Sequence, residues 1–518
     1  LWQSYMDLWS NTTRRMLGQE AEPTAEPVKG DKRFRDTEWS ENLVFDYIKQ
    51  SYLLAGQWLI HNVDDTEYPD DHTRDKVNFY MRQFVDAMAP TNFAATNPTV
   101  LKETVETRGE NLVRGLNHLL EDLEAGQGSL KIRQTAPDTF EVGKNIAVSK
   151  GKVVFQNQLM QLMQYDPSTE TQFARPLLIV PPWINKYYIL DLQPKNSFIK
   201  WATDQGHTVY VISWVNPHEE LADASFEDYM QDGPLAALAA IEKDCGVGEV
   251  NAVGYCLGGT LLASTLAYMA ATGDDRIKSA TYFASLVDFS EPGELGVFID
   301  EEHIKMVEEM MEKKGYLDGN QMATTFNMLR SNDLIWSFVI NNYLMGKDPF
   351  PFDLLYWNSD STRMPQAMHS FYLRNMYQQN LLAQPGAISL KGTPLDLGAI
   401  KTPSTMIGTK EDHIAPWKAV YKGTRLFGGE ANFILAASGH IAGIVNPPAA
   451  GKYSYWLNPD KIEDRDSWVE QAVEHEGSWW PHWQEWVSQF VGEQVPAREP
   501  GKGKLTALED APGTYVKM

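Results

Sequence analysis

The stretch NAVGYCLGGT, residues Asn251 to Thr260, places one cysteine between glycines directly after a short apolar run. The preceding EVNAV is typical of a buried strand, and the following TLLASTLAYMAA is typical of a helix. A GxCxG pattern between a strand and a helix predicts a nucleophile elbow, a sharp turn that exposes the central side chain at the sheet edge. The glycines fit because side chains two residues before and after the nucleophile would have no room. We expect Cys256 to be a catalytic nucleophile; the alternative is a structural thiol in a turn of small residues.

Strands and helices alternate from about residue 176 onward. Strands are expected in PLLIVPP, HTVYVISWVNP, EVNAVGYC and KSATYFASLVDF, with helices around SFIKWATDQG, YMQDGPLAALAAIEKDCG and after Cys256. The alternation resumes at TPSTMIGTKEDHIAP and ANFILAASGH. Apolar strands that alternate with amphipathic helices indicate a parallel sheet covered on both faces. Together with the elbow, they predict an α/β-hydrolase fold with a mostly parallel sheet.

Four further regions accompany the sheet. Residues 1–145 carry aromatic and apolar residues at helical spacing and predict an N-terminal, mainly helical domain, which leaves 146–518 as the catalytic domain. From about 290 to 380 a helical, aromatic and Met-rich stretch interrupts the alternation and predicts a cap insertion over the strand ends. In SWWPHWQEW the tryptophans have helical spacing, which favours core packing over surface adhesion. The Gly/Pro/Lys-rich stretch 496–504 predicts a loosely ordered end.

An activated thiol needs a base, and the base needs an acid that orients it. In this fold the acid and the histidine follow the nucleophile in that order. Asp412 stands just past the strand STMIG, and His440 stands just past the strand NFILAA, so both are expected at the same sheet edge as Cys256. His413 is the competing base and Glu411 the competing acid. Asp412 could instead cap the next helix, and His440 could be a structural turn residue.

The developing oxyanion requires backbone N–H donors. Leu257, directly after the cysteine, is expected to supply one of them. The second is expected from the loop VPPWINK, in which two prolines cannot donate and Ile184 is the preferred candidate. Trp183 and His413 are expected to line the substrate pocket. The sequence assigns no CoA-binding residues and no metal ligands.

Composition narrows the function classes. The 518 residues carry a formal net charge of −24, which disfavours nucleic acid as a partner. Cys245 and Cys256 are the only cysteines, so a disulfide framework is excluded and a reducing cytoplasm fits. Cys245, at a helix end, is expected to be an idle thiol. The sequence lacks a run of about eighteen apolar residues and a start typical of secretion, so we expect no membrane span and no signal peptide.

These residues resemble the class I polyhydroxyalkanoate synthases, bacterial enzymes that polymerise (R)-3-hydroxyacyl-CoA thioesters into polyester. The synthase box GxCxGG is matched by Gly254, Cys256, Gly258 and Gly259. The resemblance spans nearly all of the chain, in stretches such as DKRFRDTEWSENLVFDYIKQSYLL, PTNFAATNP, GKVVFQNQLMQLMQY, VPPWINKYYILDL, VYVISWVNP, SNDLIWSFVINNYLMGKDPFPFDLLYWNSDSTRMP, EDHIAPW, SGHIAGIVNPP and APGTYVKM.

The resemblance implies that Cys256 is the nucleophile, Asp412 the acid and His440 the base. It implies short monomers such as 3-hydroxybutyryl-CoA, no cofactor because CoA is released from the substrate, and a homodimer. It further implies a cytoplasmic enzyme at the polymer granule surface, with the N-terminal domain linked to dimerisation and granule association. A cysteine suits this chemistry because its acyl thioester is nearly isoenergetic with acyl-CoA, while attack by a 3-hydroxyl is downhill. Whether His440 or Asp412 activates that hydroxyl is left open.

Two other functions share some of these features. A Cys-dependent α/β-hydrolase, of the thioesterase or dienelactone-hydrolase kind, would use the same fold and triad but would admit water; the long insertion argues against it. A granule coat protein without catalytic activity would use the fold for adhesion only.

Overall fold

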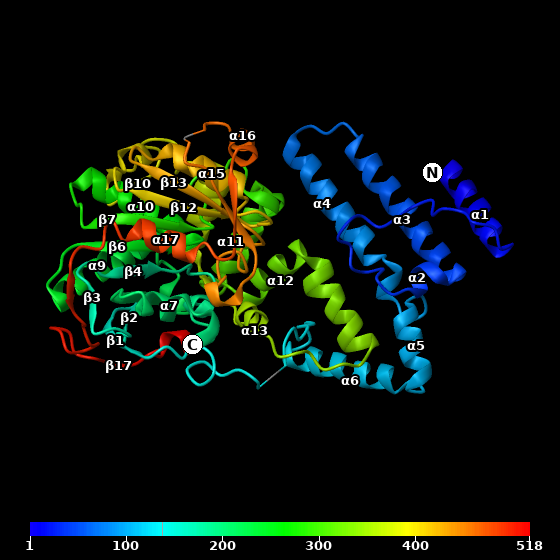
Figure 1. Cartoon of the computed structure of the whole chain (residues 1–518), viewed down its shortest axis with the longest axis horizontal. Helices are drawn as coiled ribbons and strands as arrows, with labels where there is room; N and C mark the ends of the chain where they lie inside the picture. The colour runs from blue at the N-terminus through cyan, green and yellow to red at the C-terminus, as the bar shows by residue number, and fades with distance from the viewer. Residues whose placement is uncertain (137, 461) are drawn as a thin grey trace. The chain divides into compact units, whose positions relative to one another are not determined.

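The computed structural model describes residues 1–136, 138–460 and 462–518 and divides into two compact units (Figure 1). The first unit comprises residues 1–139 and 324–352, and the second comprises 140–323 and 353–518. Part of the insertion expected at about 290–380 thus groups with the N-terminal helices, and the remainder groups with the sheet.

The second unit is built on an 11-stranded sheet in the order β15-β14-β13-β12-β7-β6-β4-β5-β2-β1-β17. The six central strands, from β13 to β5, are parallel, and the strands on both flanks are antiparallel. The mostly parallel sheet expected from the alternating pattern is confirmed. Its strands are β1 (Gly151–Gln156), β2 (Met160–Tyr165), β4 (Leu177–Val180), β5 (Val209–Trp214), β6 (Val250–Tyr255), β7 (Ile277–Phe283), β12 (Ser404–Thr409), β13 (Ala431–Ala436), β14 (Ser454–Leu457), β15 (Val473–Glu476) and β17 (Glu509–Asp510).

Helices connect and cover these strands. They are η2 (Tyr187–Leu190), η3 (Pro194–Asn196), α7 (Phe198–Asp204), η4 (Glu219–Leu221), α8 (Phe226–Met230), η5 (Gln231–Leu235), α9 (Ala236–Cys245), α10 (Leu257–Thr272), η10 (Leu397–Ala399), α15 (Trp417–Leu426), η11 (Pro448–Ala450), α16 (Arg465–Glu470), α17 (Trp480–Val487) and η12 (Tyr515–Lys517). Short two-stranded sheets pair β3 (Thr171–Phe173) with β16 (Gln494–Pro496), and β10 (Ser389–Leu390) with β11 (Thr393–Pro394).

The interruption between β7 and β12 is helical, as expected. It contains η6 (Gly293–Phe298), α11 (Glu301–Glu312), β8 (Tyr316–Leu317), α12 (Gly319–Leu329), η7 (Asn332–Trp336), η8 (Val339–Leu344), α13 (Asp353–Ser359), β9 (Met364–Pro365), α14 (Gln366–Phe371) and η9 (Tyr372–Gln378).

Tryptophans of α17 form part of the sheet core. Trp479, Trp480 and Trp483 are fully buried and lie in one cluster with Phe198 of α7 and Phe283 of β7. The ring centroids of Trp480 and Phe198 are 5.1 Å apart, as are those of Trp479 and Phe283. The predicted core role of these tryptophans is confirmed, because the helix turns its aromatic face to the sheet.

The C-terminal stretch 496–504 is tied to the sheet, so the expectation of a loosely ordered end is wrong. The guanidinium of Arg498 donates to the carbonyls of Phe173 and Ala174 and to the hydroxyl of Thr208, at 2.9 to 3.2 Å. The N–H of Lys504 donates to the carbonyl of Asp244. These long-range hydrogen bonds offset the lack of regular structure that the Gly/Pro content imposes.

The first unit is helical: α1 (Trp2–Met16), α2 (Glu38–Glu41), α3 (Leu43–Asp64), α4 (Asp71–Ala87), η1 (Pro90–Asn92), α5 (Pro98–Glu106) and α6 (Glu110–Ala125), together with η7 and η8. Asn42, Asp70 and Asn97 cap the first turns of α3, α4 and α5 through side-chain oxygens.

The first unit joins two segments that are far apart in the sequence. Asn111 of α6 donates its side-chain amide to the carbonyl of Leu344 at 2.8 Å. The phenol of Tyr343 donates to the carboxylate of Asp122 at 2.6 Å, and the amide of Asn342 donates to the carbonyl of Arg133 at 2.8 Å. The unit is therefore discontinuous along the chain.

Candidate active site

Cys256 lies in a strained turn between β6 and α10. Its backbone has φ 51° and ψ −120°, and positive φ is costly for a residue with a side chain. Its N–H donates to the carbonyl of Phe283 on the neighbouring strand β7 at 2.8 Å, which holds the turn in register. Its side chain is half-buried. The structure thus places Cys256 in the turn predicted from GxCxG.

The glycines around Cys256 are required by close backbone approaches. A methyl carbon at Gly258 would lie 2.0 Å from the carbonyl oxygen of Val180, at the end of β4. One at Gly254 would lie 2.5 Å from Cα of Gly259, and one at Gly259 would lie 2.0 Å from Oγ of Ser285. The first turn of α10 can therefore approach β4 and β6 only without side chains at these positions.

Asp412 and His440 meet at the carboxyl ends of β12 and β13. Nδ1 of His440 lies 2.7 Å from Oδ2 of Asp412, and both side chains are buried. The other carboxylate oxygen accepts the N–H groups of Ile414 and Ala415 at 2.8 and 2.9 Å, and Oδ2 also accepts the hydroxyl of Thr409 at 3.2 Å. Asp412 is thus held by its own loop while it faces the imidazole.

The electrostatics couple His440 to both partners. Burial works to lower the pKa of His440, but the charge of Asp412 and the sulfur of Cys256 outweigh it, and the two side-chain hydrogen bonds act in the same direction. The pKa of His440 is therefore raised well above its ordinary value. The ring of Tyr255 stacks near His440 at 5.8 Å between centroids, and its hydroxyl donates to the His440 carbonyl at 3.1 Å. The structure brings Cys256, His440 and Asp412 together.

The competing candidates occupy other positions. Glu411 is exposed, and its N–H donates to the carbonyl of Ser438. His413 is half-buried, and its carbonyl accepts the N–H of Glu294 at 3.3 Å. The carboxylate at His440 is that of Asp412, which favours the Asp412–His440 pair over either competitor.

The two residues expected to donate to the oxyanion lie near Cys256 in the fold, one at the start of α10 and one in the loop after β4. Leu257 is the first residue of α10, where the helix has no intrahelical acceptor for its N–H. Ile184 lies in the loop that follows β4, and β4 pairs with β6 so that Val180 stands beside Gly254. In the same loop the N–H of Asn185 donates to the hydroxyl of Thr362 at 2.8 Å and is therefore already used.

Two tyrosines of η9 were not identified from the sequence. Burial, then Tyr377 and the sulfur of Cys256, raise the pKa of the Tyr372 phenol. Burial, then the sulfur of Cys256, raise the pKa of the Tyr377 phenol. Their rings lie 5.4 Å apart, and Trp183 lies 5.7 Å from Tyr372. The Met- and aromatic-rich composition of the insertion was the only sequence signal for them.

The second cysteine has a different environment. Sγ of Cys245 donates to the carbonyl of Ile241 at 3.1 Å, at the end of α9. Burial raises the pKa of the Cys245 thiol, which disfavours the reactive thiolate.

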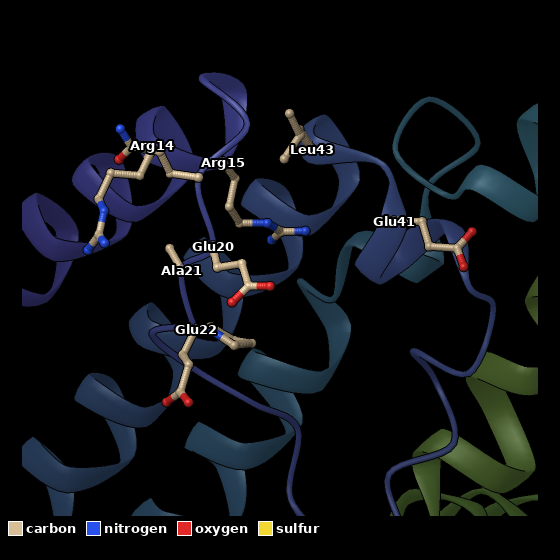
Figure 2. Close-up of a pocket in the computed structure, with 9 residues that line it drawn as sticks. Arg14, Arg15, Glu20, Ala21, Glu22, Glu41 and Leu43 are labelled. Atoms are coloured by element: carbon tan, nitrogen blue, oxygen red, sulfur yellow. The ribbon is translucent and has the colours of Figure 1, made fainter.

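A surface pocket in the first unit is lined by none of the three residues Cys256, Asp412 and His440. It is lined by charged side chains from the end of α1 and the chain that follows it (Figure 2). Arg15 donates to the carboxylate of Asp46 and to the carbonyl of Ser40, while Glu20 and Glu22 contribute carboxylates. Its lining contains neither cysteine nor histidine.

The described residues provide neither a metal-binding cluster nor a helix that could span a membrane. Within 1–136, 138–460 and 462–518, no group of three or more His, Cys, Asp or Glu side chains is placed to hold a metal ion. In the same part of the chain, none of the helices combines the length and apolar character that crossing a bilayer requires.

The parallel sheet, the strained turn after β6 and the Asp–His pair after β12 and β13 define a protein of the α/β-hydrolase fold. The family model for that fold matches residues 175–447. The predicted fold class is confirmed. Among solved structures, a monoacylglycerol lipase from Paleococcus ferrophilus is similar, with 11% identity and a TM-score of 0.35 over 64% of this chain and 98% of that chain.

The chain belongs to the poly(3-hydroxyalkanoate) polymerase family. The model of the poly-beta-hydroxybutyrate polymerase (PhaC) N-terminus matches residues 30–202. The chain is 53% identical over 515 residues to the poly(3-hydroxyalkanoate) polymerase subunit PhaC of Rhizobium meliloti (strain 1021), covering 99% of this chain and 84% of that protein. It is also 53% identical over 519 residues to the poly(3-hydroxyalkanoate) polymerase of Methylorubrum extorquens, covering 100% and 86%. The family resemblance expected from the sequence is confirmed.

Proposed function

We propose that this protein is an acyltransferase that polymerises (R)-3-hydroxyacyl-CoA, with 3-hydroxybutyryl-CoA as its monomer, into a polyester and releases CoA. The names of its relatives support the reaction class. The observation that carries the proposal is the placement of Cys256, Asp412 and His440 after the carboxyl ends of β6, β12 and β13, with His440 hydrogen-bonded to Asp412 and close enough to Cys256 for the sulfur to raise its pKa.

In the first step, His440 takes the proton of the Cys256 thiol, and the sulfur attacks the carbonyl carbon of the acyl-CoA thioester. The negative charge on the carbonyl oxygen is stabilised by the N–H groups of Leu257 and Ile184. The C–S bond to CoA then breaks, and the CoA sulfur leaves with the proton from His440. The acyl group is now a thioester on Cys256, so little free energy is lost.

In the second step, the 3-hydroxyl of a further hydroxyacyl unit attacks this thioester, the ester bond forms, and sulfur is released from the acyl carbon. The hydroxyl proton needs an acceptor, and the contacts of Asp412 favour His440 for that role. Both Asp412 oxygens already accept hydrogen bonds, and its side chain is fully buried. Asp412 therefore orients the ring and stabilises its charge, while His440 takes the hydroxyl proton and gives it to the departing Cys256 sulfur.

Polymerisation requires that water does not hydrolyse the acyl-enzyme. The buried ring of Tyr372 and the half-buried ring of Tyr377, whose phenol pKa values are both raised by the nearby sulfur of Cys256, support this exclusion. Phe289 adds a third ring at 5.0 Å from Tyr377. We assign the cap role to the helices of the insertion that carry these rings, and a pocket-lining role to Trp183. His413 remains a proposed pocket residue.

The test uses the two cysteines as a matched pair. Cys256→Ala is expected to abolish CoA release from (R)-3-hydroxybutyryl-CoA, whereas Cys245→Ala is expected to retain wild-type release. Mass spectrometry of the wild type after rapid quenching should locate the hydroxyacyl group on Cys256. Soluble hydroxy acid as the only product would favour a Cys-dependent hydrolase, and an inactive wild type would favour a granule coat protein.

We further assign the first unit to association with the granule surface and to formation of a homodimer in the cytoplasm. On α1, the side chains of Trp2, Met6 and Trp9 share one helical face and are 79%, 46% and 61% exposed. Replacing Trp2 and Trp9 by serine should reduce co-sedimentation with amorphous polyester and leave CoA release from soluble substrate unchanged. Light scattering on the wild type should give the mass of two chains; a monomer that is fully active would contradict the dimer.

A further inference from the structure

The loop that follows β4 has few free backbone donors. Its first two residues are Pro181 and Pro182, which have no N–H. The N–H of Asn185 is bonded to Thr362. Of the three candidate donors Trp183, Ile184 and Asn185, this leaves the N–H groups of Trp183 and Ile184 for an oxyanion.

Thr362 bonds the loop on both sides of Ile184. Its hydroxyl donates to the carbonyl of Trp183 at 3.1 Å and accepts the N–H of Asn185 at 2.8 Å. Thr362 is 4% exposed, so water does not compete for either bond. The two peptide planes that flank Cα of Ile184 are therefore both fixed by one side chain.

Because the peptide bond is planar, these two contacts determine where the N–H of Ile184 points. The carbonyl of Trp183 and the N–H of Ile184 belong to the same planar trans peptide and point in opposite directions. The hydrogen bond from the Thr362 hydroxyl to the Trp183 carbonyl therefore fixes the direction of the Ile184 N–H. The second bond fixes the following plane, and Asn185 takes up the bend with a left-handed φ of 60°.

Neighbours of Thr362 hold the next part of the same loop. Nζ of Lys186 pairs with Asp360 at 2.8 Å, and the same carboxylate accepts the phenol of Tyr188 at 2.7 Å. The indole N–H of Trp357 donates to the carbonyl of Lys186 at 2.6 Å. The segment 357–362 thus holds the loop along its length, with Thr362 at the end nearest to β4.

We propose that Thr362 is a positioning residue for acyl transfer, which aims the N–H of Ile184 at the oxyanion that forms on the thioester carbonyl. This inference rests on the proposed chemistry at Cys256. It assigns no contact between Thr362 and the substrate, because Thr362 acts through the peptide that it anchors. It adds a residue about 180 positions away in the sequence from the loop it controls.

The experiment compares two reactions of the same sulfur. Acylation of Cys256 by (R)-3-hydroxybutyryl-CoA develops an oxyanion, whereas alkylation of Cys256 by iodoacetamide does not and requires only the thiolate. Thr362→Val retains the shape and loses both hydrogen bonds. We expect it to lower the kcat of CoA release about 100-fold, the scale of one oxyanion donor, with KM and the alkylation rate within about twofold of wild type.

Three further variants make the result decisive. Thr362→Ser keeps the hydroxyl and should restore most of the activity. Thr362→Ala also removes the hydroxyl but leaves a smaller side chain. It should show the same loss of kcat and replaces Thr362→Val if that variant is unstable. Ser361→Ala is the matched control, since the Ser361 hydroxyl lies near Gly319, and should behave as wild type.

The outcomes separate the inference from the proposed function. An undiminished kcat in Thr362→Val, or an equal loss of acylation and alkylation, would overturn the role of Thr362. A wild type that is alkylated at Cys256 but never acylated there would instead overturn the proposed function.

Discussion

The sharpest structural prediction concerns Gly258, the second residue of α10. A methyl carbon there would meet two carbonyl oxygens of the β4 end, at 2.0 Å from Val180 and 2.6 Å from Pro181. Ordinary contact begins near 3.4 Å, so Gly258→Ala must separate α10 from β4 by more than 1 Å. Backbone atoms on both sides leave no flexible side chain to move aside.

The displacement would act on both oxyanion donors at once, because Leu257 precedes Gly258 and the Ile184 loop follows Pro181. We expect Gly258→Ala to cost roughly 1–3 kcal/mol of stability through overpacking. A misplacement of about 1 Å should lower kcat for CoA release about 100-fold. Chromatographic assay of released CoA and thermal unfolding would measure the two effects.

Gly273→Ala is the matched control at the other end of the same helix. Gly273 has φ 75° and no atom within 4 Å of an added methyl, so the change should cost about 1 kcal/mol of backbone strain and leave kcat unaltered. Wild-type kcat in Gly258→Ala, or equal losses of kcat in the two variants, would refute the steric reasoning.

Three other predictions follow from contacts of the second unit. Asp412→Asn should lower CoA release about 10³-fold or more. Asp412 raises the pKa of His440 in the folded protein, so the charged pair stabilises the wild type fully below about pH 6.5, and this gain is lost as the pH rises through the raised pKa. The variant's loss of stability should therefore be larger at pH 6 than at pH 9, and a pH-independent loss would contradict this prediction. Trp480→Phe removes the indole bond to the carbonyl of Ile444, 2.9 Å long, and should cost about 1–3 kcal/mol in denaturant unfolding and reduce kcat by loosening the His440 loop. Arg498→Ala should cost about 2 kcal/mol in the same assay, whereas a disordered tail would give no change.

The sheet and the elbow could be predicted because local signals determine them. Alternation of apolar strands and helices specifies a parallel sheet, and the strand order brings the residues after β6, β12 and β13 to one edge. The sequence position of Asp412 and His440 then suffices to place them near Cys256. The sequence favours Asp412 over Glu411 only because acid loops of this fold often carry the carboxylate just before the next helix. The structure adds the hydrogen bond between Asp412 and His440.

Other features depend on contacts that no local pattern encodes. Thr362 lies in a loop of ordinary composition, and its importance comes from a carbonyl in a distant segment. The tail at 496–504 has the composition of a flexible end, but Arg498 donates to three acceptors, on Phe173, Ala174 and Thr208. Tyr372 and Tyr377 belong to a stretch that the sequence predicts as helical, aromatic and Met-rich, without indicating which of its side chains face the sulfur.

The discontinuity of the first unit bears on how the chain folds during its synthesis. Asn111, Asp122 and Arg133 emerge from the ribosome more than 200 residues before their partners at 342–344. These three residues therefore lack their partners at 342–344 during the whole time in which strands β1 to β7 are synthesised. Removing only the first 139 residues would likewise leave η7 and η8 without the residues they bond, so deletion of the N-terminal region yields an exposed remnant rather than a clean catalytic fragment.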